Sequence, residues 1–325
     1  MLSFKIKLMH KLRKLIKSFS NCLKDIKEFG FTIAISSFIW PYLKFIPRYY
    51  SKRLMQAKHS KVIYYLSNKY KFLLQNFHFE KETLPDFNGA IWVCWLQGEI
   101  NMPPTVLTCI QALKHHANEH PVIIISFNNF QKYITLPDYI INKYQSGNIG
   151  NAHFADILRT CLLYEHGGVW IDSTLLTIQA LPKEIFIMPF YSCKFNVDSL
   201  YITQCKWSNF FLCSQKKSKV FAFTRAFFFE YIKKENRFID YFLMDYIIHL
   251  GYKSYLEIKE EIDQVPINNI YVHSLAPIIN KSYNVDIWNK LIQNTYLFKL
   301  SWKTNYIEKS NKKLSYWGFI KQHII

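Results

Sequence analysis

The chain of 325 residues carries 41 Lys and Arg against 23 Asp and Glu, a net charge of +18, and half of its residues are hydrophobic. This length and apolar fraction suit one enzyme-sized unit with a sizeable core. The seven cysteines include no Cys-x-x-Cys pair, which argues against a disulfide framework or zinc ribbon and indicates a reducing cytoplasm. The basic charge comes without zinc-finger spacing, an RNP-like sequence or an arginine-rich recognition helix, so nucleic acid is not an expected partner.

Much of the charge lies at the N-terminus. Residues 1–60 hold 13 Lys and Arg and two acids, which is 11 of the net 18 positive charges. From residue 8 apolar side chains recur at helical spacing, with lysines on the other side, and such a basic amphipathic helix is typical of proteins on an anionic membrane surface. Packing of this helix on its own domain is the alternative. No signal peptide is expected, and the apolar run 29–43, broken by Pro41, is shorter than the roughly 20 residues that span a bilayer.

The remaining elements are predicted in chain order. Residues 1–85 are expected to form a helical region, closed by a turn-rich segment at 84–89, and residues 86–325 a second domain. Strands are expected at 90–96, 122–127, 169–171 and 210–214. Helices are expected at 103–116, in a short segment that ends at residue 143, around Asp156, and at 220–233 and 238–250. Strands separated by helical patterns predict a parallel α/β sheet.

Residues 153–174 hold the most informative pattern. Asp156 and Arg159 are three residues apart, so both side chains lie on one face of a helix and can address one ligand. The Gly-Gly pair that starts at Gly167 ends this helix. A short buried strand follows and delivers Asp172 at its end. Because ligands of open α/β sheets bind at the carboxyl ends of the strands, these side chains are expected at one pocket edge.

A solvated surface ion pair with a simple helix stop is the plain alternative for this block. Against it, Lys outnumbers Arg by 35 to 6 in the chain, so an arginine is a rare choice. Arg159 also lies in an otherwise apolar helix, where its planar fork suits a phosphate or carboxylate.

This block resembles the capsular polysaccharide synthesis proteins, a bacterial branch of the glycosyltransferases related to family 32. The likeness rests on HFADILRTCLLYEHGGVWIDST and extends to IWVCWLQG, MPPTVLTCIQALKHH, WSNFFLCSQKKSKVF, FIDYFLMDY and FKLSWK, over roughly residues 25–305. Two positions depart from the pattern. Ala155 replaces a serine, and Asp172-Ser173-Thr174 replaces Asp-x-Asp, which removes one expected metal carboxylate.

The resemblance implies an α/β fold of GT-A-like, Rossmann type, with a mostly parallel central sheet and a nucleotide-sugar site. It implies a glycosyltransferase that uses a nucleotide-diphosphate sugar, with UDP-sugar first, and retains the anomeric configuration. The acceptor would be a growing capsular or other surface polysaccharide, or a lipid-linked glycan. The expected location is the inner face of the cytoplasmic membrane, with the protein peripherally bound.

The resemblance also assigns roles to residues. Trp95 and Gln97 would hold the uracil or ribose, Asp156 the donor hydroxyls, and Arg159 the sugar or diphosphate. Asp172 would coordinate Mn²⁺ or Mg²⁺, to which the hydroxyl of Thr174 adds a ligand; both ions favour carboxylate and phosphate oxygens.

Further candidates lie downstream. Asp240 is the preferred acid of FIDYFLMDY for the pocket, with a helix N-cap as the alternative. Ser301, Trp302 and Lys303 would close over the diphosphate, with a surface turn as the alternative.

Two other functions remain open at this point. A sugar-phosphate transferase of polysaccharide synthesis also uses acids, arginine and metal, and would leave phosphorus in the polymer. A non-enzymatic module that binds anionic lipid or polymer through its basic arm would bind no nucleotide.

Overall fold

The computed structural model describes residues 16, 18–80 and 89–324. The chain divides into two compact units, each built from separate stretches of sequence. The first comprises residues 1–77, 198–204 and 237–250, and the second residues 78–197, 205–236 and 251–325. The predicted boundary between residues 85 and 86 lies outside the described residues.

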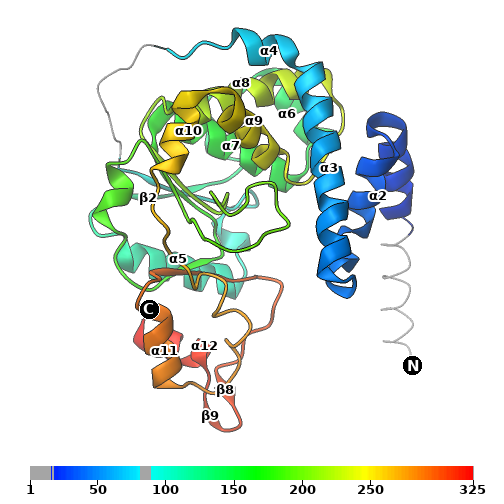
Figure 1. Cartoon of the computed structure of the whole chain (residues 1–325). Coiled ribbons are helices and arrows are strands. Elements are labelled where there is room, and N and C mark those ends of the chain that lie inside the picture. The colour runs from blue at the N-terminus through cyan, green and yellow to red at the C-terminus, as the bar shows by residue number, and fades with distance from the viewer. Residues whose placement is uncertain (1–15, 17, 81–88, 325) are drawn as a thin grey trace. The chain divides into compact units, whose positions relative to one another are not determined.

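The described part of the N-terminal region is helical. A helix at 18–29 ends at Gly30, and α2 then runs alongside α3 (Figure 1). The further elements are α2 (Phe31–Ile39), the 3₁₀ helix η1 (Trp40–Phe45), α3 (Arg48–Lys69) and α4 (Lys71–Asn76). In the part of the chain that the structure describes, no helix is both long and apolar enough to cross a bilayer.

Two later segments complete the first unit by polar contacts with α3. Lys58 forms an ion pair with Asp240, and both side chains are almost fully buried. The two ring nitrogens of His59 hydrogen-bond with the hydroxyl of Tyr246 at 2.7 Å and the carbonyl oxygen of Leu200 at 2.9 Å. Burial lowers the pKa of His59, so its ring stays neutral near pH 7. Helix α3 is therefore the element on which this unit is assembled.

The second unit is organised around a five-stranded sheet of order β2-β1-β3-β6-β5. Its strands are β1 (Ile91–Cys94), β2 (Val122–Ile125), β3 (Gly168–Ile171), β5 (Phe190–Ser192) and β6 (Phe211–Ser214). The four strands predicted from the sequence are confirmed. The sheet is mixed: β1 is parallel to β2 and β3, but β6 runs antiparallel to β3, and β5 antiparallel to β6.

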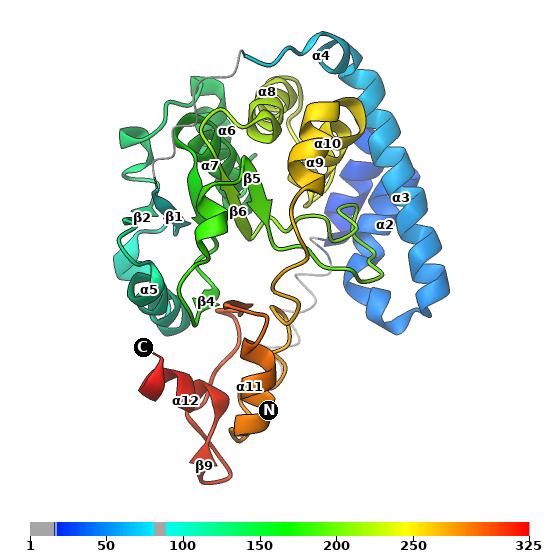
Figure 2. The same cartoon turned by 60° about the vertical axis from the view of Figure 1, so that its left-hand side comes forward.

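Helices cover both faces of this sheet. In Figures 1 and 2, α6, α7 and α8 lie on one side and α5 on the other. Helix α7 packs on β3 and β6 and against α8. The helices are η2 (Glu99–Asn101), α5 (Pro104–His116), η3 (Phe130–Lys132), α6 (Asp138–Gln145), α7 (Asn151–His166), η4 (Lys183–Phe186), α8 (Lys219–Lys234), α9 (Leu243–Ser254) and α10 (Leu256–Asp263).

The C-terminal part of the second unit has its own apolar core. Strand β4 (Leu175–Thr177) pairs antiparallel with β7 (Leu297–Lys299) and packs on α5. Residues of α5, β4, β7, α11 (Val285–Ile292) and α12 (Tyr316–His323) form one buried cluster. A small hairpin of β8 (Lys309–Ser310) and β9 (Lys313–Leu314) precedes α12. Apart from α5, which matches the helix predicted at 103–116, none of these elements was predicted from the sequence, because each is too short to show a clear hydrophobic period.

The Gly-Gly pair does more than end helix α7. Gly167 and Gly168 have φ angles of 66° and 95°, a region that favours glycine. A Cβ on Gly168 would clash with the carbonyl oxygen of Ala90 on the neighbouring strand. The indole of Trp92 also donates a hydrogen bond of 2.9 Å to the carbonyl oxygen of Gly167. The pair therefore lets β3 approach β1 closely, which fixes where Asp172 emerges.

We expect Gly168→Ala to destabilise the fold more than Gly98→Ala does. Gly98 has a similar φ of 83°, but a Cβ there meets open space, so this control measures backbone strain alone, about 1–3 kcal/mol. Gly168→Ala adds the clash with Ala90. Urea unfolding of both variants measures the difference, and equal losses would contradict the close-approach role.

Candidate functional site

The candidate site lies at the edge of the sheet where the parallel strands end. Strand β1 ends just before Trp95, and β3 ends just before Asp172. The antiparallel strand β6 begins at this same edge, and the backbone N–H of Asp172 donates to the carbonyl oxygen of Phe210 at 2.9 Å. Because β1 and β3 are parallel, Trp95 and Asp172 each follow a strand that ends at this edge.

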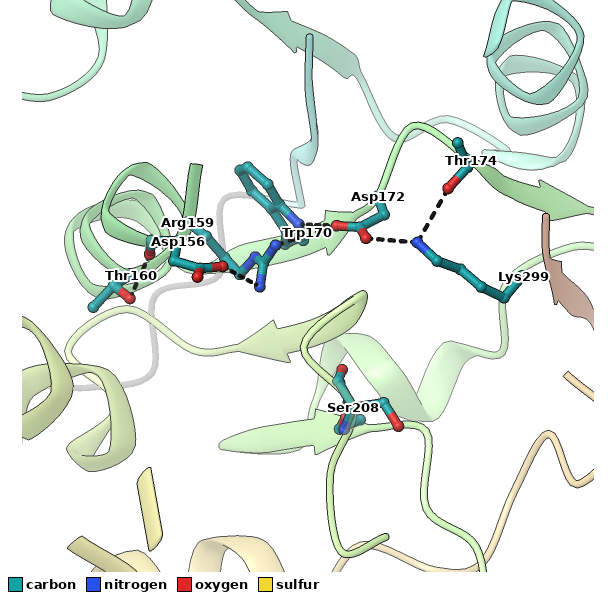
Figure 3. A network of polar contacts seen from close by, with 9 residues as sticks. Asp156, Arg159, Thr160, Trp170, Asp172, Thr174, Ser208 and Lys299 are labelled. Carbon is teal, nitrogen blue, oxygen red and sulfur yellow. Dashed lines mark hydrogen bonds and ion pairs between the residues drawn. The ribbon is translucent and has the colours of Figure 1, made fainter. Parts of the chain in front are cut away.

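Arg159 links helix α7 to strand β3 (Figure 3). One guanidinium nitrogen lies 3.1 Å from Oδ1 of Asp156, and another lies 3.2 Å from Oδ1 of Asp172. The guanidinium also stacks over the ring of Trp170, 4.8 Å from its centroid. The Arg159 side chain is only 7% exposed, so a solvated surface pair, the plain alternative for this block, does not describe it.

The carboxylate of Asp172 is the centre of this cluster. Its Oδ1 also accepts a hydrogen bond of 3.0 Å from the indole N–H of Trp170, an ordinary length for such a bond. Its Oδ2 lies 2.7 Å from the ammonium of Lys299, which also donates to the hydroxyl of Thr174 at 3.1 Å. Both carboxylate oxygens are thus paired with a cation.

Lys299 was not predicted as a site residue, although it lies in the FKLSWK segment of the family resemblance. The β4–β7 register places Lys299 opposite Leu175, next to the turn that follows Asp172. The sequence pattern that could have indicated it is a lysine between two apolar residues, Phe298 and Leu300. A charged side chain within a buried strand needs a partner. Which partner it meets depends on a pairing that spans more than 120 residues.

The pKa values of the two acids of the cluster are shifted in opposite directions from their ordinary values. Burial raises the pKa of Asp156 to about 6, although Arg159 opposes this. Burial also raises the pKa of Asp172, but Lys299 and Arg159 outweigh it and hold that pKa below its ordinary value. Asp172 is therefore ionised near neutral pH, whereas a fraction of Asp156 is protonated. Two cations then face less than two full negative charges, which favours an anionic ligand.

The donor set around Asp172 does not form a divalent-metal site in this arrangement. Asp172 and Thr174 supply two side-chain oxygens, and both contact the ammonium of Lys299. Mg²⁺ takes six oxygen ligands, of which the protein usually supplies one or two carboxylates, so the pairing of Asp172 with Lys299 is the contact that a metal would have to replace. Within residues 16, 18–80 and 89–324, no group of three or more His, Cys, Asp or Glu side chains could hold a metal ion. Metal binding by Asp172 and Thr174 stays a prediction from the resemblance.

The predicted C-terminal segment does reach the end of β1. The rings of Trp95 and Trp302 meet edge to face, with centroids 5.9 Å apart. Trp302 is 47% exposed, so part of its ring surface remains accessible. The backbone N–H of Ser301 donates to the hydroxyl of Tyr306 at 2.9 Å, and that of Lys303 to the hydroxyl of Ser301 at 3.3 Å.

Three other predicted residues have different settings. Gln97 is exposed in the turn after β1. Its backbone carbonyl oxygen accepts a hydrogen bond from the side-chain amide of Asn101 at 2.8 Å. Asp240 belongs to the first unit, where its carboxylate binds Lys58 and caps the backbone N–H of Phe242 at 2.8 Å. Its side chain is 2% exposed, so these two contacts account for its burial. The catalytic role of Asp240 stays a prediction.

The ring of His273 meets those of Phe195 and Phe210 edge to face, with centroids 6.1 and 5.6 Å away. Burial, with the nearby charge of Lys299, lowers its pKa. The ring is therefore neutral near pH 7 and adds no charge to the cluster.

Comparison with known proteins identifies the family. Residues 43–319 match the model of the capsular polysaccharide synthesis protein family, so the chain belongs to this family. The match spans most of the second unit and the strand-edge cluster. No curated protein and no solved structure matches the chain.

We expect Asp156→Asn to change how stability depends on pH. The pKa of Asp156 is about 6 in the folded chain and about 3.9 when unfolded. Between these values the folded state keeps a proton that the unfolded state releases, so this group lowers stability as pH rises from about 4 to about 6. Relative to the parent, Asp156→Asn should gain up to about 3 kcal/mol across this window.

Urea unfolding of both proteins between pH 4 and 7 measures this difference, and other titrating groups cancel in the comparison. Parallel stability curves would show that Asp156 is not held in a desolvated setting.

Proposed function

We propose that this member of the capsular polysaccharide synthesis protein family is a glycosyltransferase of GT-A-like fold. It would transfer a sugar from a nucleotide-diphosphate sugar, with UDP-sugar as first choice, to a growing polysaccharide or lipid-linked glycan. The observation that supports this most is the cluster of Asp156, Arg159 and Asp172 beside the aromatic pair of Trp95 and Trp302, at the edge where parallel strands end. Such an edge is the usual ligand site of α/β sheets.

In the proposed reaction the bond between the anomeric carbon and the diphosphate oxygen breaks, and its electron pair leaves with UDP. The oxygen of an acceptor hydroxyl forms the new bond with the anomeric carbon, with retention of configuration, and its proton is released to solvent. The main electrostatic need is relief of the charge that develops on the departing diphosphate. A site with more positive than negative charge meets this need.

The residues divide this task by chemistry. The accessible ring surface of Trp302, beside Trp95 and the amide of Gln97, would hold the uracil. Arg159, fixed by stacking on Trp170, would contact the sugar or diphosphate with its guanidinium group. Asp156 would accept hydrogen bonds from donor hydroxyls. Ser301 and Lys303 would cover the diphosphate from the C-terminal segment.

A sugar-phosphate transferase is the second enzyme class that this cluster could serve. Phosphorus analysis of the polymer product distinguishes the two, because only sugar-phosphate transfer leaves phosphorus in the chain. A non-enzymatic module for anionic lipid or polymer is the third reading, and it predicts no binding of UDP. A panel of nucleotide sugars, screened for hydrolysis and transfer, then identifies the donor.

We expect Arg159→Lys and Trp302→Ala to weaken UDP binding without unfolding the protein. Arg159→Lys keeps the charge but loses the planar fork, and Trp302→Ala removes the exposed ring. Each should raise the Kd for UDP about tenfold or more, the scale of one charged hydrogen bond or one stacked base. Isothermal titration measures the Kd.

Ile187→Ala is the matched control, because Ile187 is a 70% exposed apolar residue of the second unit outside the cluster. Unchanged UDP affinity in both site variants, with the parent binding UDP, would move the nucleotide site away from this edge.

The proposal includes peripheral binding to an anionic membrane through the N-terminal helix. Three residues of the apolar stripe remain largely accessible: Ile16, Phe19 and Leu23 are 60%, 56% and 53% exposed, although the ring of Phe19 meets that of Phe38 edge to face and Ile26 is half-buried. Other side chains of the same helix pack on the first unit, since Cys22 is 5% exposed and Asp25 pairs with Arg237. Residues 1–60, which include this helix, carry 11 of the net 18 positive charges, and each basic residue near an anionic bilayer contributes about 1 kcal/mol.

We expect the double variant Phe19→Ser, Leu23→Ser to bind anionic vesicles more weakly than the parent does. Both side chains are exposed, so the fold should survive, and the Ile187→Ser control should bind like the parent. Cosedimentation with vesicles that contain phosphatidylserine measures binding, which should also weaken as salt screens the charges. Unchanged pelleting of the double variant would assign the stripe no membrane role.

A further inference from the structure

The ammonium of Lys299 lies where the family resemblance expects a divalent cation. We propose that Lys299 takes the place of that metal: it binds the donor's diphosphate directly, and the site works without a bound metal ion. This inference rests on the proposed glycosyltransferase function and concerns only how the site supplies positive charge.

The contacts of Lys299 support this assignment first. Its Nζ is 2.7 Å from Oδ2 of Asp172 and 3.1 Å from the hydroxyl of Thr174, the two oxygens expected to bind the metal. An ammonium has three N–H donors. Asp172 and Thr174 use two, and the third is available to a phosphate oxygen. The Lys299 side chain is 25% exposed, so a ligand can reach it.

The charges around Asp172 point the same way. A divalent cation at Oδ2 would have to displace Lys299, and it would still face the guanidinium of Arg159, 3.2 Å from Oδ1. Before a diphosphate arrives, one carboxylate cannot balance a divalent ion and two side-chain cations. Asp156 adds less than a full charge near neutral pH, because burial raises its pKa to about 6. The cluster is thus balanced for cationic side chains and an incoming anion.

Lys299 is also held in place rather than loosely extended. Its backbone pairs with β4, and its N–H donates to the carbonyl oxygen of Val272 at 2.8 Å. Its ammonium lies 5.4 Å from the ring centroid of Phe210, a cation–π distance. A cation fixed before the ligand arrives stabilises the charge on the departing diphosphate with little reorganisation. This is the service that a metal ion would otherwise provide.

The first experiment compares the affinities of UDP and uridine for the parent, Lys299→Met, Lys299→Arg and the control Lys290→Met, all in EDTA. Lys290 is an exposed lysine of α11. Lys299→Met should raise the Kd for UDP about 10- to 100-fold, the scale of a lost charged hydrogen bond, and leave the Kd for uridine unchanged. Lys299→Arg should keep part of the UDP affinity, and Lys290→Met all of it. Melting temperatures show whether each variant is folded.

The second experiment measures UDP affinity and donor turnover of the parent in EDTA and in Mn²⁺. Equal values in both conditions are expected. Loss of either in EDTA, with recovery in Mn²⁺, overturns the inference whatever Lys299→Met does, and leaves the proposed function standing. UDP affinity of folded Lys299→Met equal to the parent's also overturns it. A parent that binds no UDP in either condition overturns the proposed function itself, and this inference with it.

Discussion

The candidate site depends on the ion pairs that the Asp172 carboxylate forms with Arg159 and Lys299. This carboxylate joins three elements that come from distant parts of the chain: strand β3, helix α7 through Arg159, and strand β7 through Lys299. Arg159 is almost fully buried and Lys299 three-quarters buried, so each cation would be costly without a partner. One carboxylate with two oxygens pairs both. The geometry of the sheet edge and the charge of the site therefore come from the same residue.

The rest of the local structure serves to place this carboxylate. The Gly-Gly pair lets β3 pass close to β1, and the alternation of side chains along β3 puts Trp170 on the same face as Asp172. From there the indole of Trp170 donates to Asp172 while its ring supports Arg159. Trp170, which the sequence predicted only as part of a buried strand, thus contacts both Asp172 and Arg159. Its role follows from its position two residues before the acid.

The sequence predicted those parts of the site whose geometry is local. The spacing of Asp156 and Arg159 and the glycine stop fix a helix face and a strand within about twenty residues. The parallel pairing of β1 with β2 and β3 agrees with the predicted parallel sheet, but the antiparallel pairing of β6 and β5 was not predicted. Lys299 was missed because its place depends on the β4–β7 register, which no local pattern encodes. Long-range pairing, rather than residue type, set the limit.

The same limit explains why a linear boundary describes the N-terminal region incompletely. Composition and periodicity mark residues 1–85 as basic and helical, but the compact unit also includes residues 198–204 and 237–250. The buried pair of Lys58 and Asp240 ties one of these segments to α3, because neither charge is stable there without the other. The burial of Asp240 in the FIDYFLMDY segment is therefore accounted for by its partner Lys58. A buried carboxylate with a dedicated lysine needs no ligand to explain it, whereas Asp172, shared between two cations at an accessible edge, has the charge and exposure that a substrate can use.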